Sequence, residues 1–188
     1  MFTETELRTV RLVLRPLSAL DAGALFALFS DPEVMRYWSC APWTGIAQAH
    51  DYIAGACEGL ANGGMLRLGV ELGATGELIG QIALHHFDRQ NRRCEVGYAL
   101  ARAHWGRGYL GEAMEAMLEH GFGAFQLNRV EADVDPRNTA SARLLERIGF
   151  EREGLLRERW IVAGEVCDTA FYGLLKSDWD ARRPPRPR

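Results

Sequence analysis

Six residues near the middle of the chain form a loop of a kind that can hold a phosphate. Gly106-Arg107-Gly108-Tyr109-Leu110-Gly111 reads G-x-G-x-x-G and lies between an apolar run and an amphipathic run. Glycines free the backbone, so that successive N–H groups converge on an anion at the positive end of the following helix. The pattern favours an anion site, although a glycine-rich turn before an ordinary helix has the same spelling.

The residues around this loop fit two common phosphate sites poorly. In a dinucleotide-binding fold the strand runs almost directly into the first glycine, whereas Ala101 to Trp105 intervene here. A phosphate-hydrolysing loop places Lys and then Ser or Thr after its last glycine, but Glu112 and Ala113 follow Gly111. We therefore expect the loop to bind the pyrophosphate of a different cofactor.

The apolar periodicity on either side of the loop predicts an α/β fold with a mixed sheet. The expected elements, in chain order, are a strand at 9–16, helices at 18–31 and 47–60, strands at 65–72, 78–87 and 93–101, a helix at 110–122, a strand at 129–135, a helix at 139–148 and two strands about Gly164. The glycine-rich break at 73–76 is short enough for a hairpin, so the sheet should be antiparallel at least there.

Length, charge and cysteine usage limit the class of protein. A chain of 188 residues is most simply one domain, which we place at 1–180, followed by a disordered, basic, Pro-rich tail at 181–188. The formal charge of −3 gives no general attraction to nucleic acid or acidic membranes, and no run approaches the ~18 apolar residues of a membrane span. Scattered cysteines and an acidic start in place of a signal peptide predict a cytoplasmic protein without a metal site.

Two longer stretches resemble a known family. The segments "EVGYALARAHWGRGYLGEA" (95–113) and "DPRNTASARLLERIGFEREGLLRE" (135–158) are similar to the cofactor core of the GNAT superfamily of acetyl-CoA-dependent N-acetyltransferases, and to its RimJ/RimL-type branch of ribosomal-protein acetyltransferases. The likeness extends over about 9–179. It implies a GNAT fold with a mixed, mostly antiparallel sheet of about six to seven strands and about four helices. It also implies acetyl-CoA as cosubstrate and an amine as acceptor.

The resemblance also implies which residues contact the cofactor. The family's loop pattern, Q/R-x-x-G-x-G/A, falls on Trp105 to Leu110 with Gly108 as the central glycine, and Leu110 departs from the last small position. The strands near 94–101 and 129–135 should splay, so that the pantetheine arm pairs with exposed backbone. The implied cofactor contacts are Tyr98, Ala99, Leu100, Trp105, Gly106, Arg107, Gly108, Tyr109, Leu110, Gly111 and Asn138.

Asn138 has two competing roles. The resemblance implies a contact with pantetheine, whereas its place before a helix favours an N-cap. Because one side chain can hardly do both, we favour the cofactor contact and leave the cap to Thr139.

Acetyl transfer to an amine calls for a general base, because only the neutral amine attacks. We expect Glu95 to be the base, since strand alternation puts it on the same face as Gly97, toward the acetyl end. An exposed carboxylate that pairs with Arg92 or Arg93 is the alternative. His85 or His86 is a candidate proton relay, and one of them must point inward if their strand is regular.

The departing thiolate calls for a general acid. Many family members use a Tyr seven positions after the Asn, but that position is Leu145 here. A Ser at the position of Ser141 has this role in RimL-type members, so the resemblance implies Ser141 as the acid. A helical Ser that only bonds to its own turn is the alternative.

The acceptor is expected to be a protein N-terminal α-amine. At pH 7 an α-amine with a pKa of ~7.8 is about 10% neutral, whereas a lysine with a pKa of ~10.4 is about 0.04% neutral. Deprotonation of the lysine therefore costs about 3.5 kcal/mol more free energy. The alternatives are a small amine such as a polyamine, amino acid or antibiotic and, outside enzymes, a CoA-binding sensor. A homodimer is possible.

Two further groups have open roles near the acceptor. Asp168 lies inside a strand, where a charge is costly without a function, and should either bind a cationic acceptor or pair with Arg157 or Arg159. The aromatic residues Tyr37, Trp38 and Trp43 either wall an acceptor pocket or pack as a satellite core.

Overall fold

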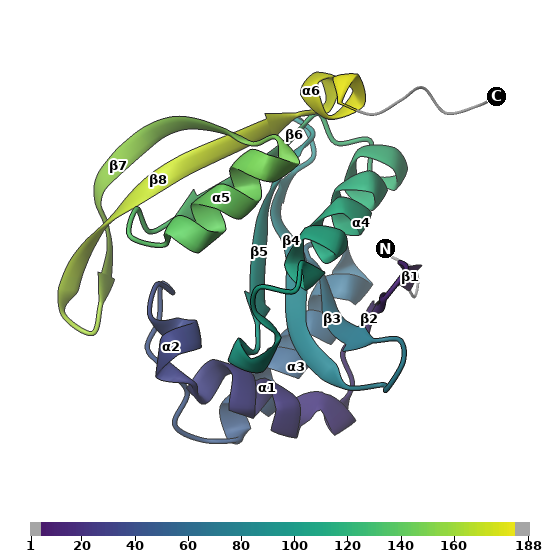
Figure 1. Cartoon of the computed structure of the whole chain (residues 1–188), viewed down its shortest axis with the longest axis vertical. Helices are drawn as coiled ribbons and strands as arrows, with labels where there is room; N and C mark the ends of the chain where they lie inside the picture. Colours follow the sequence, from purple (N-terminus) through teal and green to yellow (C-terminus); the bar gives the residue numbers. More distant parts are fainter. Residues whose placement is uncertain (1–4, 183–188) are drawn as a thin grey trace.

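The computed structural model describes residues 5–182 of the chain. These residues form one eight-stranded sheet in the order β1-β2-β3-β4-β5-β6-β8-β7, flanked by six α-helices (Figure 1). The strands are β1 (Leu7–Arg8), β2 (Leu12–Pro16), β3 (Leu66–Leu72), β4 (Leu78–Asp88), β5 (Arg93–Leu100), β6 (Arg129–Val134), β7 (Glu151–Val162) and β8 (Glu165–Leu175). The helices are α1 (Ala22–Ser30), α2 (Pro32–Met35), α3 (Ala47–Asn62), α4 (Tyr109–Ala124), α5 (Thr139–Ile148) and α6 (Lys176–Ala181).

All neighbouring strands are antiparallel except β5 and β6, which run parallel. The predicted mixed, mostly antiparallel sheet is therefore confirmed. It has eight strands because the two residues of β1 pair with the edge of β2. The helix count also rises, because Pro32 not only ends α1 but begins α2, where Asp31 caps the helix by accepting from the Glu33 N–H at 2.9 Å.

The sheet has an apolar layer on each face (Figure 1). One core lies under α4 and α5, which bury residues such as Met114, Met117 and Leu145 at helical spacing. The other lies under α1, α2 and α3, around Phe29 and Ile53. The β7–β8 hairpin reaches past the rest of the sheet toward α2 (Figure 1), so the two together border the open end of the sheet.

The C-terminal end departs from the prediction. The expectation that 181–188 are disordered is wrong for the first two residues, because Ala181 closes α6 and the Arg182 Nη2 donates to the Arg147 carbonyl at 2.8 Å. Residues 183–188 lie outside the described part of the chain. No helix in residues 5–182 is long and apolar enough to cross a bilayer.

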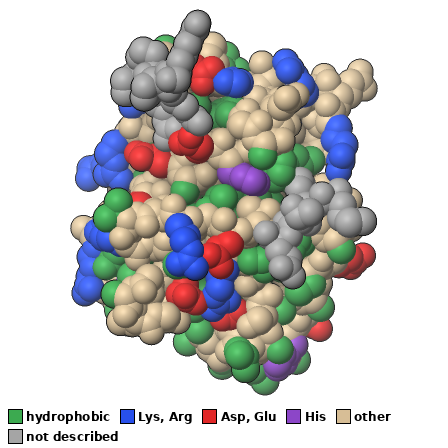
Figure 2. Space-filling model, turned by 90° about the vertical axis from the view of Figure 1, so that its right-hand side faces the viewer, with side chains coloured by type: hydrophobic (Ala, Val, Ile, Leu, Met, Phe, Trp, Pro, Cys, Tyr) green, Lys and Arg blue, Asp and Glu red, His purple; other side chains and the backbone are tan. Residues whose placement is uncertain are grey.

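The charges of the face that carries β1 are mixed in sign. Figure 2 shows basic and acidic side chains interspersed there instead of gathered into patches of one sign. This arrangement agrees with the small net charge of the chain, so any anion must be held by local geometry.

Candidate active site

The sheet opens between β5 and β6, the only parallel pair. Pairing runs from Arg93 with Arg129 to Glu95 with Glu131 and stops there, although β5 continues to Leu100 and β6 to Val134. A cavity of about 870 Å³ occupies the opening and is lined by both strands, a size typical of cofactor sites. The predicted splay is present, and it leaves strand backbone free to pair with a bound molecule.

The glycine loop lies at one end of this cavity. Gly106 and Gly108 have φ of +74° and +78°, a region that favours glycine, and Gly108 is the N-cap of α4. The first N–H groups of α4 have no partner within the helix, so they and the helix dipole can hold a pyrophosphate. Leu110, which departs from the family pattern, packs its side chain against the main core.

The other loop residues follow the prediction with one exception. All of Trp105, Gly106, Gly108, Tyr109, Leu110 and Gly111 line the cavity, and Arg107 does not. A Cβ on Gly111 would lie 3.3 Å from the Arg147 guanidinium of α5. Gly111 is therefore a small residue at a helix crossing, as the shorter family pattern implies.

Two long side chains fasten the loop. The Arg11 guanidinium forms an ion pair with Glu112 at 2.7 Å, donates to the Arg107 carbonyl at 3.0 Å and lies 4.6 Å from the centroid of the Tyr109 ring. Burial would raise the pKa of Glu112, but hydrogen bonds from Thr9 and Arg11 outweigh it and lower that pKa. Arg11 was not singled out from the sequence, because almost one hundred positions separate it from the loop.

Trp105 ties the loop to the end of β5. Its indole Nε1 donates to the Leu100 carbonyl at 2.7 Å, while 46% of the residue stays exposed. The indole N–H thus links the glycine loop to the last residue of β5. This bond sets where the loop lies relative to the opening between β5 and β6.

Asn138 lines the cavity and is also the N-cap of α5. Its Oδ1 accepts from the Ser141 N–H at 3.1 Å, so the assignment of the cap to Thr139 is wrong. The cap uses one end of the amide only. Within the described residues the Nδ2 group has no hydrogen-bond partner, so the cap does not preclude the predicted contact with pantetheine.

The structure brings a tyrosine to the predicted acid. The Tyr98 hydroxyl of β5 lies 2.6 Å from the Ser141 Oγ of α5, across the cavity that both residues line. Burial raises the pKa of Tyr98 to about 12, although its hydrogen bond with Ser141 opposes the rise. Leu145, at the family's usual Tyr position, is fully buried in the core. The phenol of Tyr98 therefore reaches Ser141 from β5, not from α5. The spacing of residues along the chain does not indicate this contact, because 43 positions separate the two residues.

Glu95 meets both histidines of β4. The strand does not end at His85 but bulges between His85 and Asp88, with His86 at φ of +51°. The two Nδ1 atoms lie 3.1 Å apart, and the His86 Nδ1 is 3.2 Å from the Glu95 Oε2. The strand is therefore not regular, so the condition for one imidazole to point inward is not met. The alternative that Glu95 pairs with Arg92 or Arg93 is wrong, because Glu95 pairs with His86 and Arg93 bonds to Glu131 at 2.7 Å.

The three groups differ in exposure. His85 is partly buried and lies over Gly97, where an added Cβ would be 3.2 Å from its Nε2. Burial, helped by the neighbouring charge of His86, lowers the pKa of His85 to about 4. His86 is exposed, with 72% of its side chain accessible, and Glu95 is partly buried at 28%. At neutral pH the His85 ring is accordingly uncharged.

Asp133 is a site residue that the sequence did not single out. It lies on β6 across the opening and lines the cavity. Its buried Oδ1 has no partner within residues 5–182, and its Oδ2 is 4.0 Å from the Arg159 Nε. Burial and the charge of Glu95 raise its pKa. Its position inside a strand, where a charge is costly without a function, could have indicated Asp133 as it indicated Asp168.

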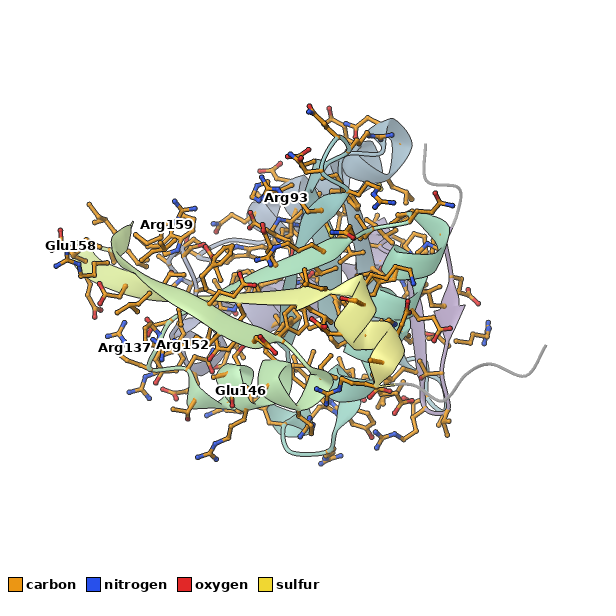
Figure 3. The ribbon with its side chains drawn as sticks, turned by 90° about the horizontal axis from the view of Figure 1, so that it is seen from above. Arg93, Arg137, Glu146, Arg152, Glu158 and Arg159 are labelled. Atoms are coloured by element: carbon orange, nitrogen blue, oxygen red, sulfur yellow. The ribbon has the colours of Figure 1, made fainter. Side chains whose placement is uncertain are left out.

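Asp168 has a structural role that neither alternative foresaw. Its Oδ1 accepts from the backbone N–H of Glu158 at 2.8 Å, where β7 bulges with φ of +54°. Pairing with Arg157 or Arg159 is thus not observed, although Asp168 does line the cavity. Figure 3 shows Glu158 and Arg159 toward the outer end of the β7–β8 hairpin.

The aromatic group divides between the two expected roles. Tyr37 and Trp38 line the cavity beside α2. Trp38 and Trp43 both pack on Phe29 in the second core, with ring centroids 5.2 and 4.6 Å apart, and Trp43 does not line the cavity. Two of the three residues therefore line the cavity, and Trp38 has both of the expected positions.

Comparison with known proteins identifies the family. The model of the acetyltransferase (GNAT) domain matches residues 11–151, well over half of the chain. The chain belongs to the GNAT acetyltransferase family. The uncharacterized N-acetyltransferase p20 of Bacillus licheniformis is 39% identical over 177 residues, which cover 92% of this chain and 97% of p20.

Two further proteins similar to this GNAT protein are an enzyme and a solved structure of the same family. The [ribosomal protein uS5]-alanine N-acetyltransferase of Escherichia coli (strain K12) is 27% identical over 189 residues, covering 96% of this chain and 95% of that enzyme. The RimJ of Mycobacterium smegmatis, solved in complex with CoA-disulfide, has a TM-score of 0.79 at 28% identity and covers 93% of this chain and 87% of RimJ. The predicted family and fold are confirmed, and this chain is an acetyl-CoA-dependent N-acetyltransferase.

Proposed function

We propose that this enzyme transfers the acetyl group of acetyl-CoA directly to a protein N-terminal α-amine, as a RimJ/RimL-type acetyltransferase of the cytoplasm. The observation that supports this most is the single cavity that runs from the N-terminus of α4, through the opening between β5 and β6, to Glu95 and Asp133. Similarity to the uS5-alanine enzyme over nearly the whole chain supports the choice of acceptor.

The cofactor end holds acetyl-CoA by backbone groups. The N–H groups from Gly108 to Gly111 bind the pyrophosphate, and the free edge of Tyr98 to Leu100 pairs with the pantetheine arm. Asn138 donates its free Nδ2 group to the same arm. Bound acetyl-CoA supplies a thioester carbonyl that a neutral amine attacks.

Glu95 removes the proton that the attacking amine loses. Its carboxylate is held by the His86 Nδ1 at 3.2 Å and lines the same cavity as Asp133, whose pKa it raises and whose Oδ1 has no partner within the described residues. Asp133 supplies a second negative charge that attracts the acceptor as an ammonium ion. A positioned base of this kind is worth roughly 10²- to 10⁴-fold in rate.

Ser141 and Tyr98 together form the acid. The raised pKa of Tyr98, about 12, keeps its hydroxyl protonated at neutral pH. The Ser141 Oγ, 2.6 Å away, gives its proton to the departing thiolate and recovers one from Tyr98, which in turn takes up a proton from solvent before the next turnover. The pair does the work that a single Tyr does elsewhere in the family.

A small cationic amine is the second candidate acceptor. The observation that favours it is the pair of carboxylates, Glu95 and Asp133, at the acceptor end, because such charges attract an ammonium ion whatever it is attached to. The preference for an α-amine depends instead on its greater neutral fraction, about 10% at pH 7.

The experiment that tests the function is thiol release from acetyl-CoA, with mass spectrometry of the acceptor. The panel holds a peptide with a free N-terminal Ala, the same peptide with a blocked N-terminus and one Lys, and spermidine. We expect acetylation of the free N-terminus only. Faster turnover with spermidine would favour the small-amine reading, and tight acetyl-CoA binding without turnover of any amine would leave a CoA-binding sensor.

A further inference from the structure

Three groups that can bind a metal converge at the bulge of β4. One donor atom each of His85, His86 and Glu95 lies within 4.8 Å of the other two. Consecutive residues of a regular strand point to opposite faces, so the bulge at His86 is what brings both imidazoles to the same side. No metal site was expected from the sequence, because the scattered cysteines have neither a C-x-x-C pair nor a histidine at ligand spacing beside them.

Hydrogen bonding alone leaves this cluster incompletely satisfied. The His86 Nδ1 lies 3.1 Å from the His85 Nδ1 and 3.2 Å from the Glu95 Oε2. A ring nitrogen has either one hydrogen or one lone pair. If the His86 Nδ1–H donates to the Glu95 carboxylate, the His85 Nδ1 can at best share that same hydrogen. A cation between the three atoms would accept a lone pair from each.

The spacing matches the donor set of a tetrahedral zinc ion. With bonds of ~2.0–2.1 Å to nitrogen and oxygen, two ligands of a tetrahedral zinc ion are about 3.3–3.4 Å apart. Two of the three donor pairs are close to this, at 3.1 and 3.2 Å. The third pair, between His85 and Glu95, lies within 4.8 Å. Two histidines and one Glu are also a common zinc set with a fourth position left open.

We propose that His85, His86 and Glu95 form a binding site for a divalent transition-metal ion, zinc above all, whose open position faces the acceptor end of the cavity. Zinc at this site engages the Glu95 carboxylate, so it inhibits acetyl transfer by competing with the amine. This inhibition rests on the proposed role of Glu95 as base, whereas the binding itself does not.

The binding is tested on the full chain after treatment with a chelator, in the absence of substrates. Co²⁺ is titrated as a coloured substitute and followed by its visible d–d absorption, and Zn²⁺ is titrated by calorimetry. We expect one ion per chain. His86→Ala removes an exposed ligand with little effect on folding, and it should weaken binding by more than about 10-fold, since even outer-shell partners of a metal are worth 10- to 100-fold.

Two comparisons make the result decisive. His50→Ala alters an exposed histidine outside the cavity and should leave the affinity unchanged. Equal affinities of the His86→Ala and unmodified proteins, a sulfur-to-cobalt charge-transfer band from a cysteine, or no binding below about 1 mM would each overturn the site. Zinc binding with loss on His86→Ala, in a protein that acetylates no amine, would uphold the site and remove only the proposed function.

Discussion

The two ends of the active-site cavity are built in different ways. The cofactor end consists of backbone N–H groups from one continuous segment, Trp105 to Gly111, braced by Arg11 and the indole of Trp105. The acceptor end consists of side chains from separate strands, of which His86 depends on a bulge with positive φ. A backbone site can be encoded locally, whereas a side-chain site depends on irregularities that only the assembled sheet fixes.

Replacement of the proposed base should have the largest effect on kcat. This effect should leave the cofactor end of the cavity unchanged. We expect Glu95→Gln to lower kcat by roughly 10²- to 10⁴-fold with little change in KM for acetyl-CoA, because the amide keeps the shape but cannot take a proton. Glu115→Gln, on the exposed face of α4, is the matched control. Steady-state kinetics at saturating amine check it, and a tenfold rise in KM for acetyl-CoA would mean that the two ends are not separable.

Removal of the hydroxyl pair should lower kcat by about 10²-fold, at the lower end of acid–base effects. Ser141→Ala and Tyr98→Phe should give similar losses, since the hydroxyls form one 2.6 Å pair. The double variant should then be no slower than either single one, because groups that act as a unit are not additive. Unchanged turnover of Ser141→Ala would remove Ser141 from the mechanism.

Addition of a Cβ to the glycine loop should instead weaken the binding of acetyl-CoA. Gly108 has φ of +78°, where an alanine costs roughly 1–2 kcal/mol. Gly108→Ala should therefore weaken acetyl-CoA binding by about 10-fold, measured by calorimetry. The control is Gly123→Ala in the same helix, where a Cβ has open space. An equal loss of affinity in both variants would show that the helix, and not the loop, sets affinity.

The smallest effect concerns stability at the acceptor end. The raised pKa of Asp133 means that the folded state prefers the protonated form. Its favourable contribution is present below the unfolded pKa of ~3.9 and is lost as pH rises through the folded pKa. Asp133→Asn should thus raise Tm at pH 7 by about 2–4 °C for ~1 kcal/mol and leave it unchanged near pH 3. Thermal melts at both pH values check this, and an equal gain at both would assign the effect to packing.

Much of the cofactor end could be predicted from the sequence, because residues that are neighbours along the chain determine its conformation. Glycines at 106 and 108 mark positive φ, and the amphipathic run after them marks a helix, at whose N-terminus we propose the anion site. The order of strands and helices followed from apolar periodicity in the same way. Asn138 shows the limit: its position before a helix was evident, but that its Oδ1 caps α5 and leaves the Nδ2 group free required the geometry.

By itself, the sequence determined the family, the order of the elements and the glycine loop, since each depends on neighbours along the chain. Only the tertiary structure decided that Tyr98 reaches Ser141, that Asp133 and Glu95 line one cavity, and that His85 and His86 come together. Those pairings depend on where β5 leaves β6 and where β4 bulges. Such features arise from the packing of the whole sheet, because a shift of one residue in a strand redirects its side chains.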